Sequence, residues 1–265
     1  MLFHAFLFMV RAFDFLGNIA IVNFPKNYNP KEKKKFALKI LKSNGSIKTV
    51  LEKIGRFKGR LRKPSMKFVA GENTKEVVYR ENGCVFRFNI DKTYFSSRLS
   101  NERKEIASLI KPKDKVLVMF AGVAPFPVTI AKNSKASKVY SNELNREANK
   151  YGRLNAELNK VKDKIVFLDG DIKRVVKKIK EKFDVIVMPR PQLKDSFLKE
   201  AFSLSKKGTR IYYYDFCLED EKNLILEKIK NEAKKAKKKI KILKIKNAGE
   251  IAPYKNRIRV DLVVL

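Results

Sequence analysis

The chain has 265 residues, of which 44% are hydrophobic, enough to bury the core of one large domain or two modest ones. Its 61 lysines and arginines against 28 aspartates and glutamates leave a net charge of +33, which favours a polyanionic partner such as RNA or DNA. Genome composition or heat adaptation is the alternative explanation, although thermophilic proteins usually match lysine with glutamate.

Residues 1–92 are predicted to form a small α+β domain that faces RNA. We predict a strand at 15–22, a helix with a basic outer face at 31–41, and short strands at 49–54, 67–70, 76–80 and 84–89. Asn82-Gly83 separates the last two strands and is a typical hairpin turn. The apolar residues 1–10 are too short to span a bilayer, so we expect an edge strand or short helix there and no membrane partner.

Residues 93–265 are predicted to form a second domain of alternating strands and helices. Strands are expected at 115–120, 138–141, 165–168, 183–188, 209–214, 240–245 and 257–264, and helices at 101–110, 127–131, 146–159, 172–182, 194–205 and 218–238. Such repeated units imply a mostly parallel sheet covered on both faces. The predicted class is α/β: a Rossmann-like class I methyltransferase domain with seven strands, including an antiparallel edge strand.

Few residues of the metal-binding and redox types are present. His4 is the single histidine, and Cys84 and Cys217 lie far apart. We therefore expect no metal site, no histidine-based triad and no disulfide framework, but reduced thiols in a cytoplasmic protein. The sequence gives no sign of an obligate protein partner.

A tight turn follows the strand at 115–120 and is the clearest ligand-binding motif. Gly122 lets the backbone approach a ligand, and the helix that follows offers free N–H groups. Glu143 comes about twenty residues later, at the end of the next strand, where a carboxylate can accept hydrogen bonds from a ribose diol. Asp171 follows the third strand and could hold the exocyclic amine of adenine. Helix capping or a first-turn position is the alternative role of both acids.

Two further segments could carry chemistry. If Asn101 caps a helix, Glu102 lies in its first turn near Arg98, and a carboxylate beside a guanidinium can act as a base and an anion stabiliser. The alternative for Glu102 is a carboxylate that only complements the helix dipole. Pro189-Arg190-Pro191 ends the fourth strand at the crevice where open sheets bind ligands, and a rigid loop without chemistry is its alternative.

As a set, these segments resemble the archaeal and eukaryotic tRNA (guanine-37-N1)-methyltransferase family. The similar segments are 94–103, 119–126, 143–145 and 249–253, while 14–20 and 71–74 resemble that family's middle domain. The resemblance covers nearly the whole chain, in order and spacing, but not the additional N-terminal domain of full-length members.

The resemblance implies S-adenosylmethionine as methyl donor and guanosine 37, in the anticodon stem-loop of tRNA, as acceptor. Glu102 would remove the N1 proton, Arg98 would donate to the guanine O6, and Pro189 stands in the motif that orients the target base. The residues expected around the donor are Tyr94, Phe120, Ala121, Gly122, Val123, Glu143, Leu144, Asp171 and Ile172. Arg103 and Asn145 are expected near the target nucleotide.

The chain departs from the family pattern at three places. The family usually has an acid where Val118 stands, glycine where Ala124 stands, and Asn-Leu-Pro where Pro189-Arg190-Pro191 stands. Some archaeal branches that vary the last motif also methylate a wyosine precursor at the same nucleotide, which is therefore a second candidate substrate. Two alternatives stay open: aminocarboxypropyl transfer in wyosine biosynthesis, whose enzymes generally lack the arginine at Arg98, and a non-catalytic tRNA-binding protein on the same scaffold.

Overall fold

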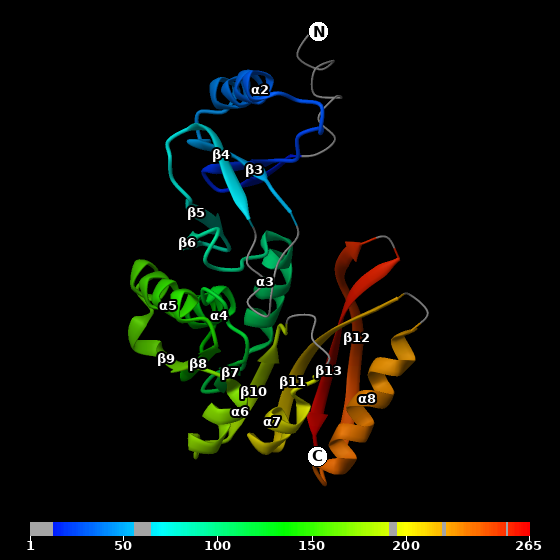
Figure 1. The fold of residues 1–265 in the computed structure, drawn as a ribbon. Helices are drawn as coiled ribbons and strands as arrows, with labels where there is room; N and C mark the ends of the chain where they lie inside the picture. Colours follow the sequence, from blue (N-terminus) through cyan, green and yellow to red (C-terminus); the bar gives the residue numbers. More distant parts are fainter. Residues whose placement is uncertain (1–12, 56–64, 191–194, 219–220, 253) are drawn as a thin grey trace. The chain divides into compact units, whose positions relative to one another are not determined.

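The computed structural model describes residues 13–55, 65–190, 195–218, 221–252 and 254–265 (Figure 1). The chain divides into two compact units, Met1–Ser97 and Arg98–Leu265. The element predicted within residues 1–10 lies outside the described ranges. Within those ranges, no helix is both long enough and apolar enough to cross a membrane.

The first unit is built on a four-stranded sheet of order β1-β2-β3-β4. Its strands are β1 (Phe13–Leu16), β2 (Ile19–Val22), β3 (Thr49–Lys53) and β4 (Met66–Gly71). The prediction of one strand over 15–22 is wrong, because the chain reverses at Gly17-Asn18 and β1 pairs antiparallel with β2. Gly17 has φ +59°, and a Cβ there would lie 2.0 Å from the Val78 carbonyl oxygen, so only glycine fits the turn.

In the described part of this unit, a helix and a hairpin accompany the sheet. Helix α2 (Pro30–Ser43) begins at a capping box formed by Asn29 and Glu32 and buries Phe36, Ala37 and Ile40 in the core over β2, β3 and β4. β5 (Glu76–Glu81) and β6 (Cys84–Asn89) form the hairpin predicted around Asn82-Gly83. The side chain of Asn18 donates to the Glu76 carbonyl and accepts from the Val78 amide, at 3.2 and 2.7 Å.

The second unit contains a seven-stranded sheet of order β12-β13-β11-β10-β7-β8-β9. Its strands are β7 (Lys115–Val118), β8 (Lys138–Glu143), β9 (Ile165–Asp169), β10 (Phe183–Met188), β11 (Ser205–Leu218), β12 (Ile240–Ala252) and β13 (Lys255–Val264). Four neighbouring pairs of this sheet are parallel: β11 with β10, β10 with β7, β7 with β8, and β8 with β9. Strand β13 pairs antiparallel with both β11 and β12. The predicted mostly parallel seven-stranded sheet is confirmed, with its antiparallel strand second from the edge.

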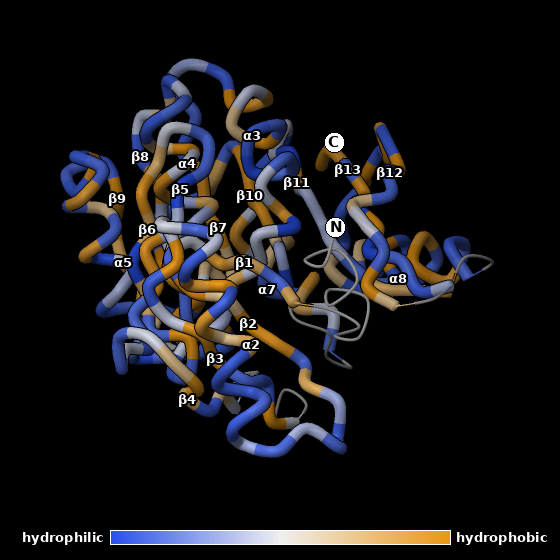
Figure 2. The backbone as a smooth tube through the Cα atoms, turned by 90° about the horizontal axis from the view of Figure 1, so that it is seen from above, coloured by the Kyte–Doolittle hydropathy of each residue, from blue (hydrophilic) through white to orange (hydrophobic). Residues whose placement is uncertain are grey.

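Helices cover both faces of this sheet (Figure 1). They are α3 (Ser100–Leu109), α4 (Pro125–Asn133), α5 (Arg146–Leu158), α6 (Ile172–Val175), α7 (Leu198–Ser203) and α8 (Lys222–Lys235). α6, α7 and α8 pack on one face through Ile172, Phe202 and Ile229, which share a core cluster with Leu117 and Ile186 of the sheet. In Figure 2, which is coloured by hydropathy, strand β10 is mainly hydrophobic and helix α2 is largely hydrophilic.

Some predicted boundaries are wrong. The helix predicted at 172–182 is only one α-helical turn, followed by a 3-10 turn over Val176–Lys178, although Val176 and Ile179 still pack against the core cluster. The helix predicted at 194–205 is limited to α7, which begins after Phe197 in the left-handed conformation. The strand predicted at 115–120 ends at Val118, because Phe120 has a φ of +59°.

Candidate active site

The turn between β7 and α4 is tied to the end of β8. The amide of Ala121 donates to the Asn142 carbonyl at 2.8 Å, and the amide of Gly122 donates to Glu143 Oε2 at 2.7 Å. The carbonyl of Val123 accepts from Asn155 Nδ2 at 2.9 Å. The predicted pairing of this turn with the acid of the next strand is therefore built into the fold.

The left-handed backbone at Ala124 explains why glycine is usual at this position. Ala124 precedes α4 with φ +63° and ψ +35°, a conformation that costs an alanine about 1–2 kcal/mol. Its methyl group faces Gly152 of α5, where an added Cβ would lie 3.3 Å from the Ala124 Cβ and 3.0 Å from Phe167. The missing side chain at Gly152 makes room for the alanine.

Glu143 is the acid best placed to hold a ribose. Besides accepting from Gly122, it accepts from the Asn145 amide at 2.8 Å through Oε1. Burial raises the pKa of this carboxyl group, while the hydrogen bonds from the Asn145 and Gly122 amides act in the opposite direction. Because a carboxylate oxygen can accept more than one hydrogen bond, both oxygens can still accept from a ribose diol. The donor set therefore fits a ribose-bearing methyl donor such as S-adenosylmethionine.

Three of the predicted ligand residues have structural roles in this fold. Asp171 caps α6 by accepting from the Lys173 amide at 3.0 Å, and Asn145 caps α5 by accepting from the Glu147 amide at 3.1 Å. Ile172 is 2% exposed and belongs to the core. Leu144, between Glu143 and Asn145, is half-buried. The capping alternative is thus the one seen for Asp171, and any ligand contact adds to that role.

Helix α3 presents the predicted base, although not through the expected cap. The helix begins after Leu99 without a side-chain cap, so Asn101 is not the N-cap. Arg98 lies in the preceding 3-10 turn and is exposed. Glu102 is only 4% exposed and Arg103 only 1%, so both point into the protein.

The aromatic ring of Phe126 lies between Glu102 and the turn that joins β7 to α4. Phe126, in the first turn of α4, lies 5.8 Å from the Arg103 guanidinium and 6.1 Å from the centroid of the Tyr214 ring. The hydroxyl of Tyr214 in turn donates to Glu102 Oε2 at 2.9 Å. The turn after β7 and the carboxylate of Glu102 therefore belong to one packed site.

Glu102 is held by side chains that lie more than 100 residues away in sequence. Arg259 of β13 donates to Oε2 at 2.7 Å, and Lys246 of β12 donates to Oε1 at 2.7 Å. Tyr214 of β11 completes the set, and burial together with the nearby Glu102 charge raises the pKa of its hydroxyl group. These partners fix both oxygens of the carboxylate.

Two further acids share these cations. Arg259 also pairs with Glu105 at 2.7 Å and with Asp261 at 2.7 Å, and Lys246 also pairs with Glu105. We call Glu102, Glu105, Asp261, Lys246 and Arg259 the carboxylate cluster. Partial burial raises the pKa of Glu105, but the hydrogen bonds from Arg259 and Lys246 dominate and lower it to about 2. Three carboxylates against two cations leave one net negative charge.

Sequence reasoning missed four members of this cluster and Tyr214. Glu105 follows Glu102 by three residues, a spacing that places both on one helix face, and Arg259 and Asp261 alternate along one face of β13. Either pattern could have been noted. The sequence does not indicate that α3 packs beside β12 and β13, which is what brings these residues together.

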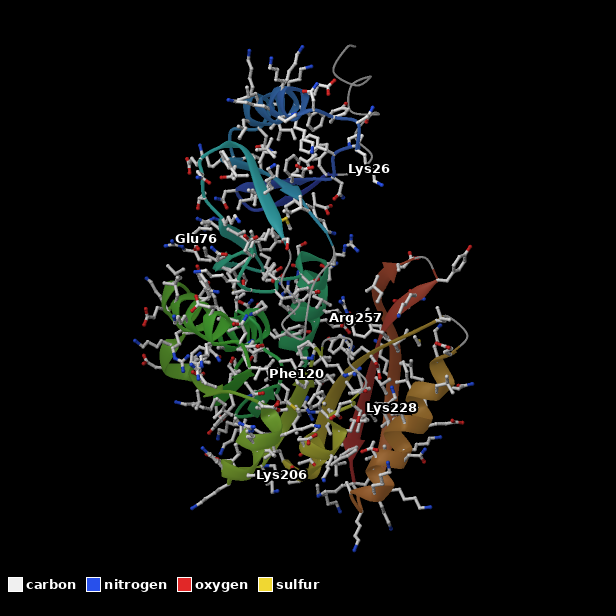
Figure 3. The ribbon with its side chains drawn as sticks, viewed as in Figure 1. Lys26, Glu76, Phe120, Lys206, Lys228 and Arg257 are labelled. Atoms are coloured by element: carbon white, nitrogen blue, oxygen red, sulfur yellow. The ribbon has the colours of Figure 1, made fainter. Side chains whose placement is uncertain are left out.

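Arg190, which follows β10, is a buried arginine. Pro189 is half-buried, whereas Arg190 is 3% exposed and pairs with Asp215 of β11. Asp215 also accepts from Tyr213 at 2.7 Å and from Lys228 at 2.9 Å, and Lys228 is labelled in Figure 3. Arg190 also donates to the Asp195 carbonyl at 2.7 Å, so it anchors the loop after β10. Tyr94 lies in the first unit, where it is half-buried.

Comparison with known proteins gives a consistent result. The family model described as the TRM5/TYW2 methyltransferase domain matches residues 77–243, and the TYW2 N-terminal domain matches residues 8–74. The tRNA (guanine(37)-N(1))/4-demethylwyosine(37)-methyltransferase Taw22 of Nanoarchaeum equitans is 32% identical, covering 96% of this chain and 100% of its own length.

Two solved structures of similar proteins match nearly the whole chain. The crystal structure of Trm5b from Pyrococcus abyssi has a TM-score of 0.83 at 32% identity, covering 96% of this chain and 75% of that protein. The complex of aTrm5 with tRNALeu has a TM-score of 0.82 at 25% identity, covering 99% of this chain and 74% of that one. The fold, the donor-binding turn and these matches together show that the chain belongs to the TRM5/TYW2 methyltransferase family.

Proposed function

We propose that this protein is an S-adenosylmethionine-dependent methyltransferase that modifies N1 of guanosine 37 in tRNA, next to the anticodon. The observation that carries the proposal is the packing of the donor-binding turn against the buried Glu102 through Phe126 and Tyr214. Methylation of a ring nitrogen needs a donor site and a base within one site, and this unit supplies both.

The donor is held at the carboxyl ends of β7, β8 and β9. Glu143 accepts hydrogen bonds from the ribose hydroxyl groups, and the backbone of Phe120, Ala121, Gly122 and Val123 lines the methionine end. Leu144, Asp171 and Ile172 border the adenine. S-adenosylmethionine, when bound, supplies an electrophilic methyl group on its sulfonium.

At the acceptor, Glu102 would take the proton from N1 of the guanine, and the freed electron pair would form the new bond to the methyl carbon of the donor. The bond between that carbon and the sulfonium sulfur would break, and its electron pair would stay on the sulfur of a neutral thioether. Arg98 donates to O6, where negative charge develops as the proton leaves. Arg103 and Asn145 border the target nucleotide, and Pro189 lies where the family orients the base.

The test uses labelled donor with tRNA transcripts that carry G or A at position 37. We expect label only in the G37 transcript, and digestion should release 1-methylguanosine. Equal labelling of both transcripts, or an aminocarboxypropyl group in the nucleoside, would contradict the proposal. Donor binding measured by calorimetry separates an inactive scaffold from an enzyme assayed with the wrong tRNA.

Matched variants test the base. Glu102→Gln should reduce the single-turnover rate by at least about a hundredfold, because general base catalysis contributes about 10²–10⁴-fold. Glu105→Gln is the control, since it shares Arg259 and Lys246 but is not proposed to touch the substrate. Equal loss in both variants would assign the effect to the cluster as a whole and not to a base.

A wyosine precursor at the same nucleotide is a second candidate acceptor. Taw22 of Nanoarchaeum equitans, which is matched over 100% of its own length, is named for two activities: methylation of guanine 37 and of 4-demethylwyosine 37 in tRNA. The replacement of the Asn-Leu-Pro motif by Pro189-Arg190-Pro191 removes a polar side chain from the guanine-orienting motif, which favours a broader acceptor range. Mass analysis of tRNA carrying 4-demethylwyosine, incubated with the enzyme, tests this directly.

A further inference from the structure

Helix α2 of the first unit carries an unusually uniform row of positive charge. Its buried face consists of Phe36, Ala37 and Ile40. A shallow groove on the helix surface is lined by Leu38 and by the lysines that we call the lysine stripe: Lys31, Lys34, Lys35, Lys39 and Lys42. Their spacing of three, four, eight and eleven residues from the first lysine places them along one side of the helix. Figure 3 shows nitrogen-tipped side chains projecting from α2 on the side away from its sheet.

This arrangement costs the helix stability. Lys31 and Lys35 are like charges four residues apart, and such a pair destabilises a helix by about 0.2–0.5 kcal/mol. Glu32, the single acid of α2, is engaged with the Asn29 amide in the capping box. An acidic side chain at one of these positions would relieve the repulsion, yet the stripe has none.

Two helical lysines elsewhere in the chain pair with an acid of the same helix. Lys150 pairs with Glu147 at 2.7 Å in α5, and Lys235 pairs with Glu232 at 2.8 Å in α8. A surface that keeps mutual repulsion in the absence of a ligand is stabilised when a polyanion binds it.

The dimensions suit a nucleic acid backbone. From Lys31 to Lys42 the helix rises about 16 Å, and an exposed duplex presents a phosphate charge about every 1.7 Å of its axis. Lysine binds phosphate as a point charge and needs no fixed geometry. Leu38, 50% exposed in the middle of the stripe, offers apolar surface to a ribose.

We propose that the lysine stripe of α2 is a contact surface for the phosphate backbone of tRNA, separate from the residues at the target nucleotide. The inference rests on the proposed function, because it takes tRNA as the substrate. It adds a surface on the first unit that contributes to the affinity for tRNA without contacting a base.

The test measures tRNA affinity as a function of salt for two matched triple variants. Lys31→Gln, Lys35→Gln and Lys42→Gln together neutralise three exposed lysines of the stripe; Lys230→Gln, Lys234→Gln and Lys237→Gln neutralise three exposed lysines in and after α8. Loss of three phosphate contacts should lower the slope of log K against log salt by about 2–3 and the affinity at 0.1 M salt by at least about tenfold. The α8 variant should keep the slope of the wild type within about 0.5.

Two further readouts decide how a failure is assigned. Circular dichroism should show the stripe variant folded and at least as heat-stable as the wild type at low salt, because like-charge pairs are removed. If the wild type methylates G37 tRNA but the two variants lose affinity equally, or the stripe variant loses none, the stripe proposal is overturned while the proposed function stands. If the wild type transfers no methyl group to tRNA, the proposed function fails instead. Weakened binding to anionic lipid vesicles with unchanged tRNA binding would also overturn the proposal, by assigning the stripe to a membrane.

Discussion

Replacement of Arg259 by methionine tests whether the carboxylate cluster is organised around one cation. Arg259 is completely buried and donates to Glu102, Glu105 and Asp261. Methionine has a similar length but no charge, so the variant leaves Lys246 to pair with Glu102 and Glu105 and removes the ion pair of Asp261. Breaking a buried ion pair by removing one partner costs about 3–5 kcal/mol, because the remaining charges stay buried.

The matched control is Lys235→Met, which breaks a surface pair with Glu232. A pair of this exposed i,i+3 type contributes about 0.3–0.5 kcal/mol. With a urea m-value of about 3 kcal/mol/M, we expect the unfolding midpoint of the second unit to fall by about 1–1.7 M in Arg259→Met and by less than about 0.2 M in the control. Circular dichroism is the suitable signal, because the chain contains no tryptophan.

Arg259→Lys separates charge from geometry. Lysine keeps one positive charge but not the planar fork that reaches three carboxylates, so we expect an intermediate loss of stability. The pH profile of the single-turnover rate should shift in both variants, since the electrostatic surroundings of Glu102 change. An Arg259→Met protein that unfolds at the same urea concentration as the wild type would refute the reasoning.

Two other predictions concern the donor turn and acid stability. Gly152→Ala should be destabilising, because its Cβ would crowd Phe167 and Ala124, and the penalty should shrink by at least about 0.5 kcal/mol when Ala124→Gly is added; strictly additive effects in a double-mutant cycle would contradict this packing. The folded-state pKa of Glu105 lies at about 2, below its usual 4.5, so its stabilising contribution is present above pH 4.5 and is lost as the pH falls toward 2. The thermal midpoint of the wild type should therefore exceed that of Glu105→Gln at pH 5, with the gap closing by pH 2; a gap that does not change with pH would show that the ion pairs are not its source.

Much of the fold could be predicted because its signals are local. Apolar strands alternating with amphipathic helices predicted the parallel sheet of the second unit. Asn82-Gly83 predicted the hairpin of β5 and β6 in the first unit. The strand expected at 15–22 was wrong because both of its halves are apolar, and only the close approach of Gly17 to Val78 reveals the reversal. The length of α6 was overestimated because Ile172, Val176 and Ile179 keep a helical spacing and pack against the core, although the α-helix itself ends at Val175.

The proximity of Gly122 and Glu143 could be predicted from the sequence, whereas the surroundings of Glu102 could not. Gly122 and Glu143 are joined by a hydrogen bond that the motif implies, because both come from neighbouring strand ends. The surroundings of Glu102 depend on the register of β12 and β13 against α3, which no local pattern encodes. The left-handed conformation at Ala124 was likewise invisible, although the glycine usual at that position was a hint.

The distance in sequence between Glu102 and its partners has a consequence for biosynthesis. Arg259 follows Glu102 by 157 residues, and Lys246 follows it by 144. At about 5–20 residues per second, a ribosome needs roughly 10–30 s to add the arginine after the glutamate. During that interval the nascent chain cannot form the ion pairs around the carboxylate, so the carboxylate cluster is completed only after β13 has been synthesised.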